Sequence, residues 1–250
     1  MAKLLRADLA RLFQSRVFLL CTALMFGFAI TIASVMNLSA DFNRATDSIM
    51  FGNTQFLGIV IAVFVGTFVG TDYSNGTIRN KLLLHSRASI YISNLILCIT
   101  ASLIIHFAWL LVFLLSEAFG LTEKFEMTNE NILLSILVSI LAVAALSSFF
   151  LLICMLIASK STALATVLIL SFIMLYTSVT IVEERGNPPP LSEFLPDYQF
   201  MWLSSIVKPS PLGYFIDMPD NFNMFPLFSL LIIALTTTVG LYIFQKKDFK

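Results

Sequence analysis

The sequence predicts an all-α protein that crosses a membrane six times. Hydrophobic residues make up 58% of its 250 residues and charged residues only 12%, and the mean hydropathy is +0.90. A soluble domain usually carries about twice that charged fraction. Six apolar runs each approach the ~20 residues that a helix needs to cross a hydrocarbon core about 30 Å thick. We therefore expect one membrane domain over residues 1–250.

The charge balance and the cysteines exclude several classes of site. The 15 basic and 15 acidic residues cancel, and no basic tract predicts a nucleic-acid partner. Cys21, Cys98 and Cys154 each lie inside an apolar run, without the spacing of metal ligands. We expect them to pack as small apolar residues rather than to form disulfides or to bind a metal.

Residues 2–16 predict an amphipathic helix that lies in the membrane interface. One side of it carries Leu4, Leu5, Leu9, Leu12 and Phe13, and the other carries Lys3, Arg6, Arg11 and Arg16. Basic amphipathic helices of this kind bind along membrane surfaces. The alternative is an ordinary charged flank that only fixes the topology of the first span.

The predicted spans cover residues 17–36, 53–71, 90–116, 132–158, 163–182 and 227–244. Between the last two lies a segment of a different kind, 183–225. All eight prolines of the chain fall between Pro188 and Pro226. Residues 191–207 mix aromatic side chains with Glu193 and Asp197, which favours short helices folded back at the outer interface.

Two rows of residues on the spans indicate helix contacts. Gly58, Ala62, Gly66 and Gly70 recur every four residues on the second span, so a neighbouring helix of the same chain or of a second copy approaches closely there. On the third span the row is polar: Asn94, Cys98, Ser102 and His106. Polar groups inside a membrane need partners, so this row either makes interhelical hydrogen bonds or lines a substrate path.

The basic residues predict the orientation. Eleven fall on the side that holds both ends of the chain: Lys3, Arg6, Arg11, Arg16, Arg79, Lys81, Arg87, Lys160, Lys246, Lys247 and Lys250. Four fall on the other side: Arg44, Lys124, Arg185 and Lys208. Because basic residues concentrate in cytoplasmic segments, both termini and the elbow at residues 72–89 are expected in the cytoplasm.

The sequence lacks the residues of a self-powered transporter or an enzyme. Gly76 and Thr77 are not followed by the lysine of a phosphate-binding loop, so we expect no ATP hydrolysis by this chain. His106 has no nucleophile or acid at a spacing that would assemble a catalytic set. The third and fourth spans hold no carboxylate, the group that ion-coupled carriers use inside the membrane.

The elbow resembles the signature of the type-2 ABC export permeases. An acid, Asp72, follows the second span, and the motif continues with Gly76-Thr77, basic residues at Arg79 and Lys81, a leucine pair at Leu82 and Leu83, and Arg87 before the third span. The six-span topology, the interfacial helix and an outer re-entrant hairpin resemble that family over the whole chain. Asp72 stands where the family usually has Glu, and Asn94 where it often has Lys.

This resemblance implies a membrane subunit of an ATP-binding-cassette exporter in a bacterial plasma membrane. Two copies, as a homodimer, would form the pathway, and a separate ATPase subunit would bind ATP and Mg²⁺. The elbow would contain a coupling helix that seats in the ATPase, which assigns contacts to Asp72, Gly76, Thr77, Arg79, Lys81, Leu82, Leu83 and Arg87.

The cargo is less defined than the architecture. Permeases of this length resemble exporters of amphipathic peptides and toxins, and the 24 Phe residues suit an apolar cargo or simply lipid. Export of lipid, sugar, drug or sodium stays open. An alternative from another class is a sensor or assembly subunit that binds an ATPase and transports nothing.

Overall fold

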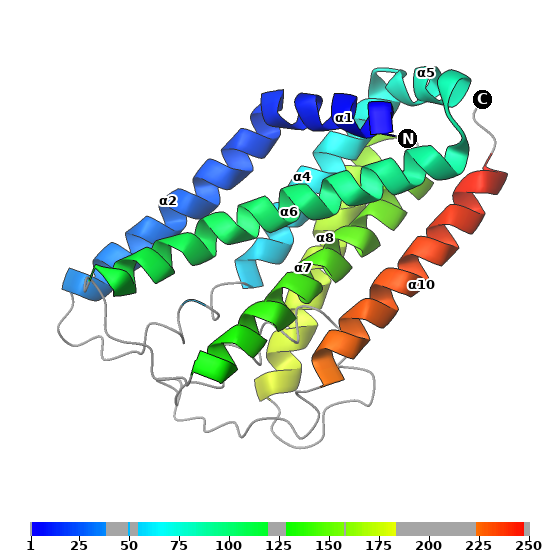
Figure 1. Ribbon diagram of the computed structural model, residues 1–250. Helices are drawn as coiled ribbons and strands as arrows, with labels where there is room; N and C mark the ends of the chain where they lie inside the picture. Colours follow the sequence, from blue (N-terminus) through cyan, green and yellow to red (C-terminus); the bar gives the residue numbers. More distant parts are fainter. Residues whose placement is uncertain are drawn as a thin grey trace.

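The computed structural model describes residues 2–38, 50, 55–119, 129–157, 159–183 and 224–247. The regular structure in these ranges is entirely helical (Figure 1). The helices are α1 (Ala2–Gln14), α2 (Arg16–Leu38), α4 (Gln55–Ser74), α5 (Thr77–Leu84), α6 (Arg87–Ala118), α7 (Asn129–Leu156), α8 (Lys160–Glu183) and α10 (Phe225–Lys246).

Six of these helices are long and apolar enough to cross a membrane, namely α2, α4, α6, α7, α8 and α10. The predicted all-helical membrane fold with six spans is therefore confirmed, and each predicted span matches one helix with ends that agree to within about three residues. The predicted hairpin at residues 183–225 lies almost wholly outside the described residues.

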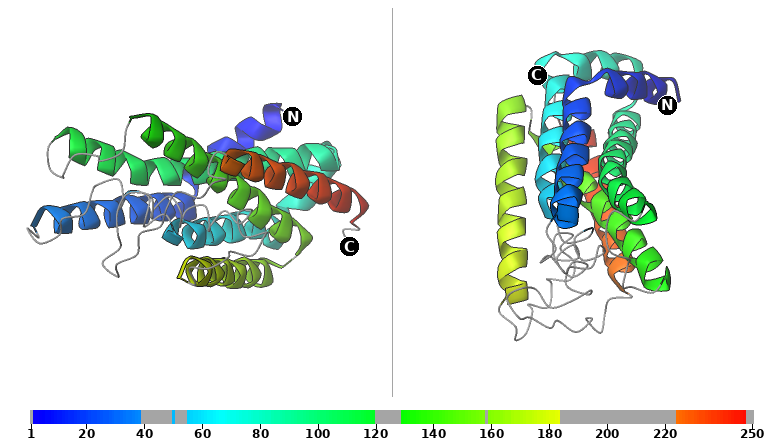
Figure 2. Two further views of the ribbon diagram at one scale, coloured as in Figure 1. Left: turned by 90° about the horizontal axis from the view of Figure 1, so that it is seen from below. Right: turned by 90° about the vertical axis from the view of Figure 1, so that its left-hand side faces the viewer.

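The spans form one bundle, and α1 and α5 lie across its end (Figures 1 and 2). Within the bundle α7 contacts α4, α6, α8 and α10, while α2 packs along α6. The predicted amphipathic helix is α1, but only part of its apolar side is buried. Leu4 and Leu12 are buried against the bundle, whereas Phe13 is 57% exposed.

Local residues explain where the helices at this end begin and stop. Ser86 is extended at φ −66° and ψ 149°, and its hydroxyl accepts the backbone N–H of Ser89, which caps α6. Gly76, between α4 and α5, has φ 67°, a left-handed conformation that favours glycine. The chain can therefore turn sharply within two residues between α4 and α5.

The glycine row of α4 packs against α8 of the same chain. A Cβ atom at Gly66 would lie 3.0 Å from the Cα of Leu164, and one at Gly70 would lie 3.0 Å from the Cα of Lys160. Ala62 is fully buried. The sequence left open whether this row packs against a helix of the same chain or of a second copy. In the structure it packs against a helix of the same chain.

A second close approach joins α6 to α10. The Tyr91 hydroxyl donates to the carbonyl oxygen of Thr236 across 3.3 Å. A Cβ atom at Gly240 would lie only 2.0 Å from that hydroxyl oxygen. The absence of a side chain at Gly240 thus makes room for a tyrosine that is fully buried.

A larger side chain at Gly66 should separate α4 from α8. We expect Gly66→Leu to lower the free energy of unfolding by about 1–3 kcal/mol, the usual cost of overpacking a filled contact. The measurement is the thermal melting of the purified protein in detergent. The matched control is Gly27→Leu, because a Cβ atom at Gly27 has nothing within 4 Å. Equal melting temperatures for the two variants would contradict the close contact.

Candidate functional site

A largely buried cluster of two carboxylates and two cations joins three helices, α1, α4 and α5, at the end of the bundle that holds α1 and α5. Lys81 on α5 is at its centre. Its Nζ atom lies 2.9 Å from Oδ1 of Asp8 on α1 and 3.0 Å from Oδ2 of Asp72 on α4. Ser93 on α6 lies 3.5 Å from Asp8 through its hydroxyl. We call Asp8, Arg11, Asp72 and Lys81 the ion-pair network.

Arg11 on α1 completes the network from the other side of Asp72. Its two Nη atoms face the two carboxylate oxygens, with Nη2 3.2 Å from Oδ2, and Nη1 pairs with Oδ1. The guanidinium also lies over the ring of Phe68, 4.5 Å from the ring centre. This forked geometry is the one in which Arg binds carboxylates most strongly.

Burial and neighbouring charges shift the pKa of Arg11 in opposite directions. Burial alone lowers the pKa of its guanidinium, but the hydrogen bond to Asp72 and the charges of Asp72 and Asp8 outweigh burial, so the pKa is raised. Arg11 therefore remains charged in its contact with Asp72.

Three members of the network are nearly inaccessible to water, and Arg11 is partly exposed. Asp72 is 1% exposed, Asp8 4% and Lys81 7%. A buried charge without a partner is costly, whereas a balanced and hydrogen-bonded set is tolerated. Removing one member is therefore more damaging than removing an opposite pair.

The local sequence explains how each member reaches the cluster. Asp8 shares the buried face of α1 with Leu4 and Leu12, four residues away on each side. Asp72 lies in the last turn of α4, because that helix continues to Ser74 rather than ending at the predicted residue 71. Lys81 follows the Gly76 turn by one helical turn, on the same face of α5 as Ile78, which is also buried.

The opposite face of α5 is uncovered and carries two leucines. Leu83 is 84% exposed and Leu84 79% exposed, while Leu82 is partly buried and packs against the core. Arg79 is also exposed on this helix. The sequence predicted Lys81 and Leu83 as parts of one outward surface. The structure separates them, because the Lys81 ammonium is already bound inside the chain.

Arg87 contacts the end of α10. Its Nη1 atom donates to the carbonyl oxygens of Gln245 and Lys247, each 2.7 Å away. The guanidinium thus occupies carbonyls that a helix end leaves without internal donors. The expected contact of Arg87 with an ATPase is therefore in competition with a bond inside the chain.

Lys247 binds the end of α7 in the same way. Its Nζ atom lies 2.9 Å from the carbonyl oxygen of Met155 and 3.0 Å from that of Leu156. The Tyr73 hydroxyl donates to the Met155 oxygen as well. Burial lowers the pKa of the Lys247 ammonium. Together Arg87 and Lys247 hold the ends of α6, α7 and α10 against one another.

The polar row of α6 faces α7. Asn94 Nδ2 lies 3.9 Å from the sulfur of Met155, and His106 Nε2 lies 3.0 Å from Oγ of Ser139. Ser102 is fully buried. These contacts support interhelical hydrogen bonding, the first of the two alternatives that the sequence offered for this row.

Two members of the ion-pair network, Asp8 and Arg11, were not predicted as site residues. A signal for Asp8 was present, since an acid on the same helical face as Leu4 and Leu12 has to be buried with a cation. No protein-family model matches the chain, and no curated protein matches it.

Loss of Lys81 should be much more damaging than loss of a balanced pair. In Lys81→Met, Asp8 is left buried without a cation, and we expect the free energy of unfolding to fall by about 3–5 kcal/mol. In the double variant Asp8→Asn with Lys81→Met, the remaining Arg11–Asp72 pair is neutral, so most of that stability should return. Both are measured by thermal melting.

Arg79→Met is the matched control, because Arg79 is an exposed cation on the same helix as Lys81. A double variant as unstable as Lys81→Met alone would contradict the importance of charge balance.

Proposed function

We propose that this chain is the membrane subunit of an ATP-driven exporter, powered by a separate ATPase subunit. The chain has no phosphate-binding loop of its own, so ATP and Mg²⁺ would be bound by the partner. The protein would act in a bacterial plasma membrane, with both termini and α5 in the cytoplasm.

The observation that carries this proposal is the uncovered leucine pair on α5. Leu83 and Leu84 are the two most exposed leucines among the described residues. They lie on a short helix at the end of the bundle, beside exposed Arg79. Burial of a leucine contributes about 1.5–3 kcal/mol, and an apolar anchor beside a cation is a common centre of a protein interface.

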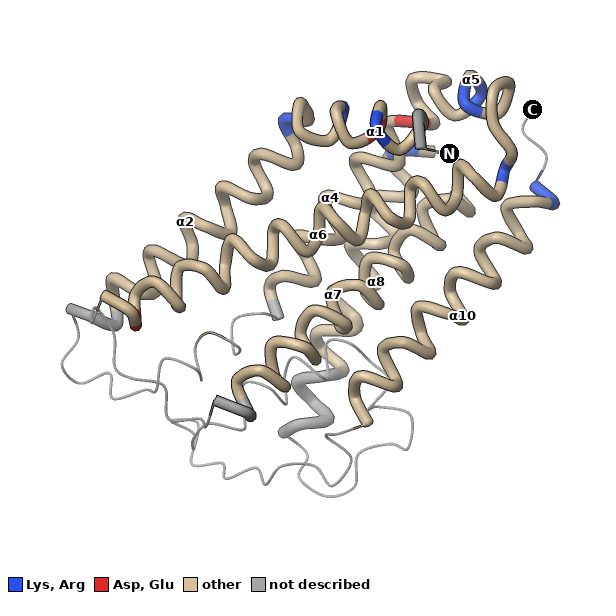
Figure 3. The backbone as a smooth tube through the Cα atoms, viewed as in Figure 1, with Lys and Arg blue, Asp and Glu red and all other residues tan. Residues whose placement is uncertain are grey.

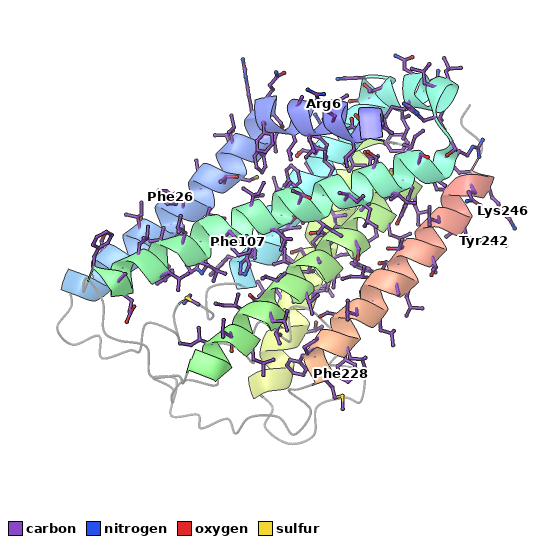
Figure 4. All side chains as sticks on the ribbon, viewed as in Figure 1. Arg6, Phe26, Phe107, Phe228, Tyr242 and Lys246 are labelled. Carbon is purple, nitrogen blue, oxygen red and sulfur yellow. The ribbon has the colours of Figure 1, made fainter. Side chains whose placement is uncertain are left out.

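The distribution of charge supports the orientation. The described Lys and Arg residues gather at the end of the bundle where α1 and α5 lie (Figure 3). Lys246 and Tyr242 lie together at the end of α10 that belongs to this side, with Nζ 2.5 Å from the tyrosine hydroxyl (Figure 4). Basic and aromatic side chains of this kind are typical of the cytoplasmic interface.

The ion-pair network supports a mechanical role for α5. Force applied to the leucine pair would be carried by Lys81 to Asp8 on α1 and to Asp72 on α4. Because these three helices share one buried charge cluster, α5 cannot move outward alone without exposing carboxylates that have lost their cation. ATP-driven movement of the partner would therefore displace α1, α4 and α5 together.

A second copy of the chain and an amphipathic cargo complete the proposal. The helices α8 and α10 leave most of their surface uncovered by this chain, which suits lipid and a homodimer contact. Amphipathic peptides or toxins are the cargo that the family resemblance favours, with lipid, sugar, drug or sodium as alternatives.

An acidic residue in the leucine pair should abolish ATPase binding. We expect Leu83→Asp to reduce the ATPase that co-purifies with the tagged chain at least tenfold, because a charge would replace the apolar anchor (about 1.4 kcal/mol per factor of ten). Arg79→Glu should weaken binding in the same direction. Quantitative mass spectrometry of pull-downs from the host membrane measures both.

The matched control is Gln14→Glu, which adds one negative charge to an exposed position of α1. It should leave co-purification unchanged, and all three variants should melt like the parent protein. If Leu83→Asp retains the ATPase at parental levels, α5 is not the docking helix.

Transport itself is tested in vesicles that contain the chain and its co-purified ATPase. We expect ATP-dependent movement of a labelled amphipathic cationic peptide, and we expect Leu83→Asp to reduce that movement at least tenfold as well. A complex that binds ATPase normally but moves no peptide, lipid or drug analogue would favour the non-transporting sensor instead.

A further inference from the structure

The interface between α6 and α7 contains two buried polar atoms, Nδ1 of His106 and Oγ of Ser102, that have no hydrogen-bond partner among the described residues. His106 is fully buried, and its Nε2 atom lies 3.0 Å from Oγ of Ser139. The hydroxyl of Ser139 lies 2.8 Å from the carbonyl oxygen of Ile136. Both contacts lie on membrane-spanning helices, in surroundings that offer little bulk water.

These distances determine which nitrogen of His106 carries the proton. A carbonyl oxygen can only accept, so the Ser139 hydroxyl donates to Ile136. Its oxygen must then accept from His106, which means that Nε2 carries the hydrogen. Nδ1 of the neutral ring is consequently an acceptor, and it has no donor among the described residues.

Ser102, one helical turn before His106, also carries a polar atom without a hydrogen-bond partner. Its hydroxyl is buried and lacks a partner in the described part of the chain. Other hydroxyls on these helices bond to the carbonyl four residues earlier, as Thr100 does with Ile96 and Ser147 with Val143. The Ser102 hydroxyl does not.

Helix geometry brings these two atoms near one another. Side chains in an α-helix lean toward its N-terminus, so the His106 ring lies over the turn that contains Ser102. Residues four apart have Cβ atoms about 5–6 Å apart. A water molecule that bonds to both atoms joins them across about 4.5 Å, since its two hydrogen bonds of about 2.7–2.8 Å meet at a roughly tetrahedral angle.

We propose that His106 and Ser102 bind an ordered water molecule in the interior of the bundle. The water donates one hydrogen to Nδ1 of His106 and accepts the hydroxyl hydrogen of Ser102. Buried waters of this kind typically bond to otherwise unsatisfied polar groups and are costly to remove. Ser135, one turn before Ser139 on α7, is also buried and has no partner among the described residues.

The direction in which Ser102→Ala changes the melting temperature distinguishes a bound water from two unpaired groups. With a water present, Ser102→Ala removes one of its bonds and should lower the melting temperature of the full-length protein by about 2–4 °C. With no water, the same change removes a buried unsatisfied hydroxyl and should leave the melting temperature unchanged or raise it. An unchanged or raised value overturns the proposal.

The matched control is Ser147→Ala. Ser147 is as deeply buried on the neighbouring helix, but its hydroxyl is satisfied by Val143 of its own helix. Removal of this hydroxyl leaves a carbonyl that keeps its backbone bond, so the melting temperature should change less than in Ser102→Ala. A fall in Ser147→Ala as large as in Ser102→Ala overturns the assignment to a water.

A direct readout is the ¹⁵N spectrum of the His106 ring in the full-length protein in lipid. We expect a hydrogen on Nε2, a hydrogen-bonded Nδ1 acceptor, and a magnetisation-transfer peak between water and the ring that weakens in Ser102→Ala. A hydrogen on Nδ1, or a ring with no transfer from water, overturns the proposal whatever the melting temperatures.

Discussion

The arrangement of the bundle end depends on one constraint, the charge balance of a cluster in which two carboxylates and a lysine are almost fully buried. Asp8 and Asp72 are buried against Lys81, and Asp72 also pairs with the partly exposed Arg11. Each of these residues comes from a helix that must therefore lie within reach of the others. The positions of α1 and α5 across the end of the spans follow from this requirement as much as from apolar packing.

The spans themselves were predictable because their physics is local. A run of about 20 apolar residues has no alternative to a helix in hydrocarbon, so length and composition decide each span. The close helix contact at the glycine row was also predictable, since the spacing of Gly66 and Gly70 places them on one face of α4. Its partner was not, because nothing in one helix identifies the backbone that fills its groove.

The ion-pair network could not be predicted from the sequence for the same reason. Lys81 meets Asp8 across 73 positions, and the contact depends on the turn at Gly76 and on how α1 lies across the bundle. A helical wheel assigns Arg11 to the polar side of α1, whereas the structure turns it toward Asp72. The positive-inside pattern counts Lys81 and Arg87 as surface charges, yet both bind atoms of their own chain.

The burial of Asp8 and Asp72 also affects the electrostatic potential at the protein surface. Both carboxylates at this end of the described chain are withdrawn and neutralised, whereas Arg6, Arg16, Arg79, Lys160 and Lys246 remain exposed. The surface there is consequently cationic although the whole chain has a net charge of zero. Anionic headgroups are attracted to such a surface by about 1 kcal/mol per cation. The bilayer surface is thus attracted to the end of the protein where the buried acidic and basic side chains balance one another.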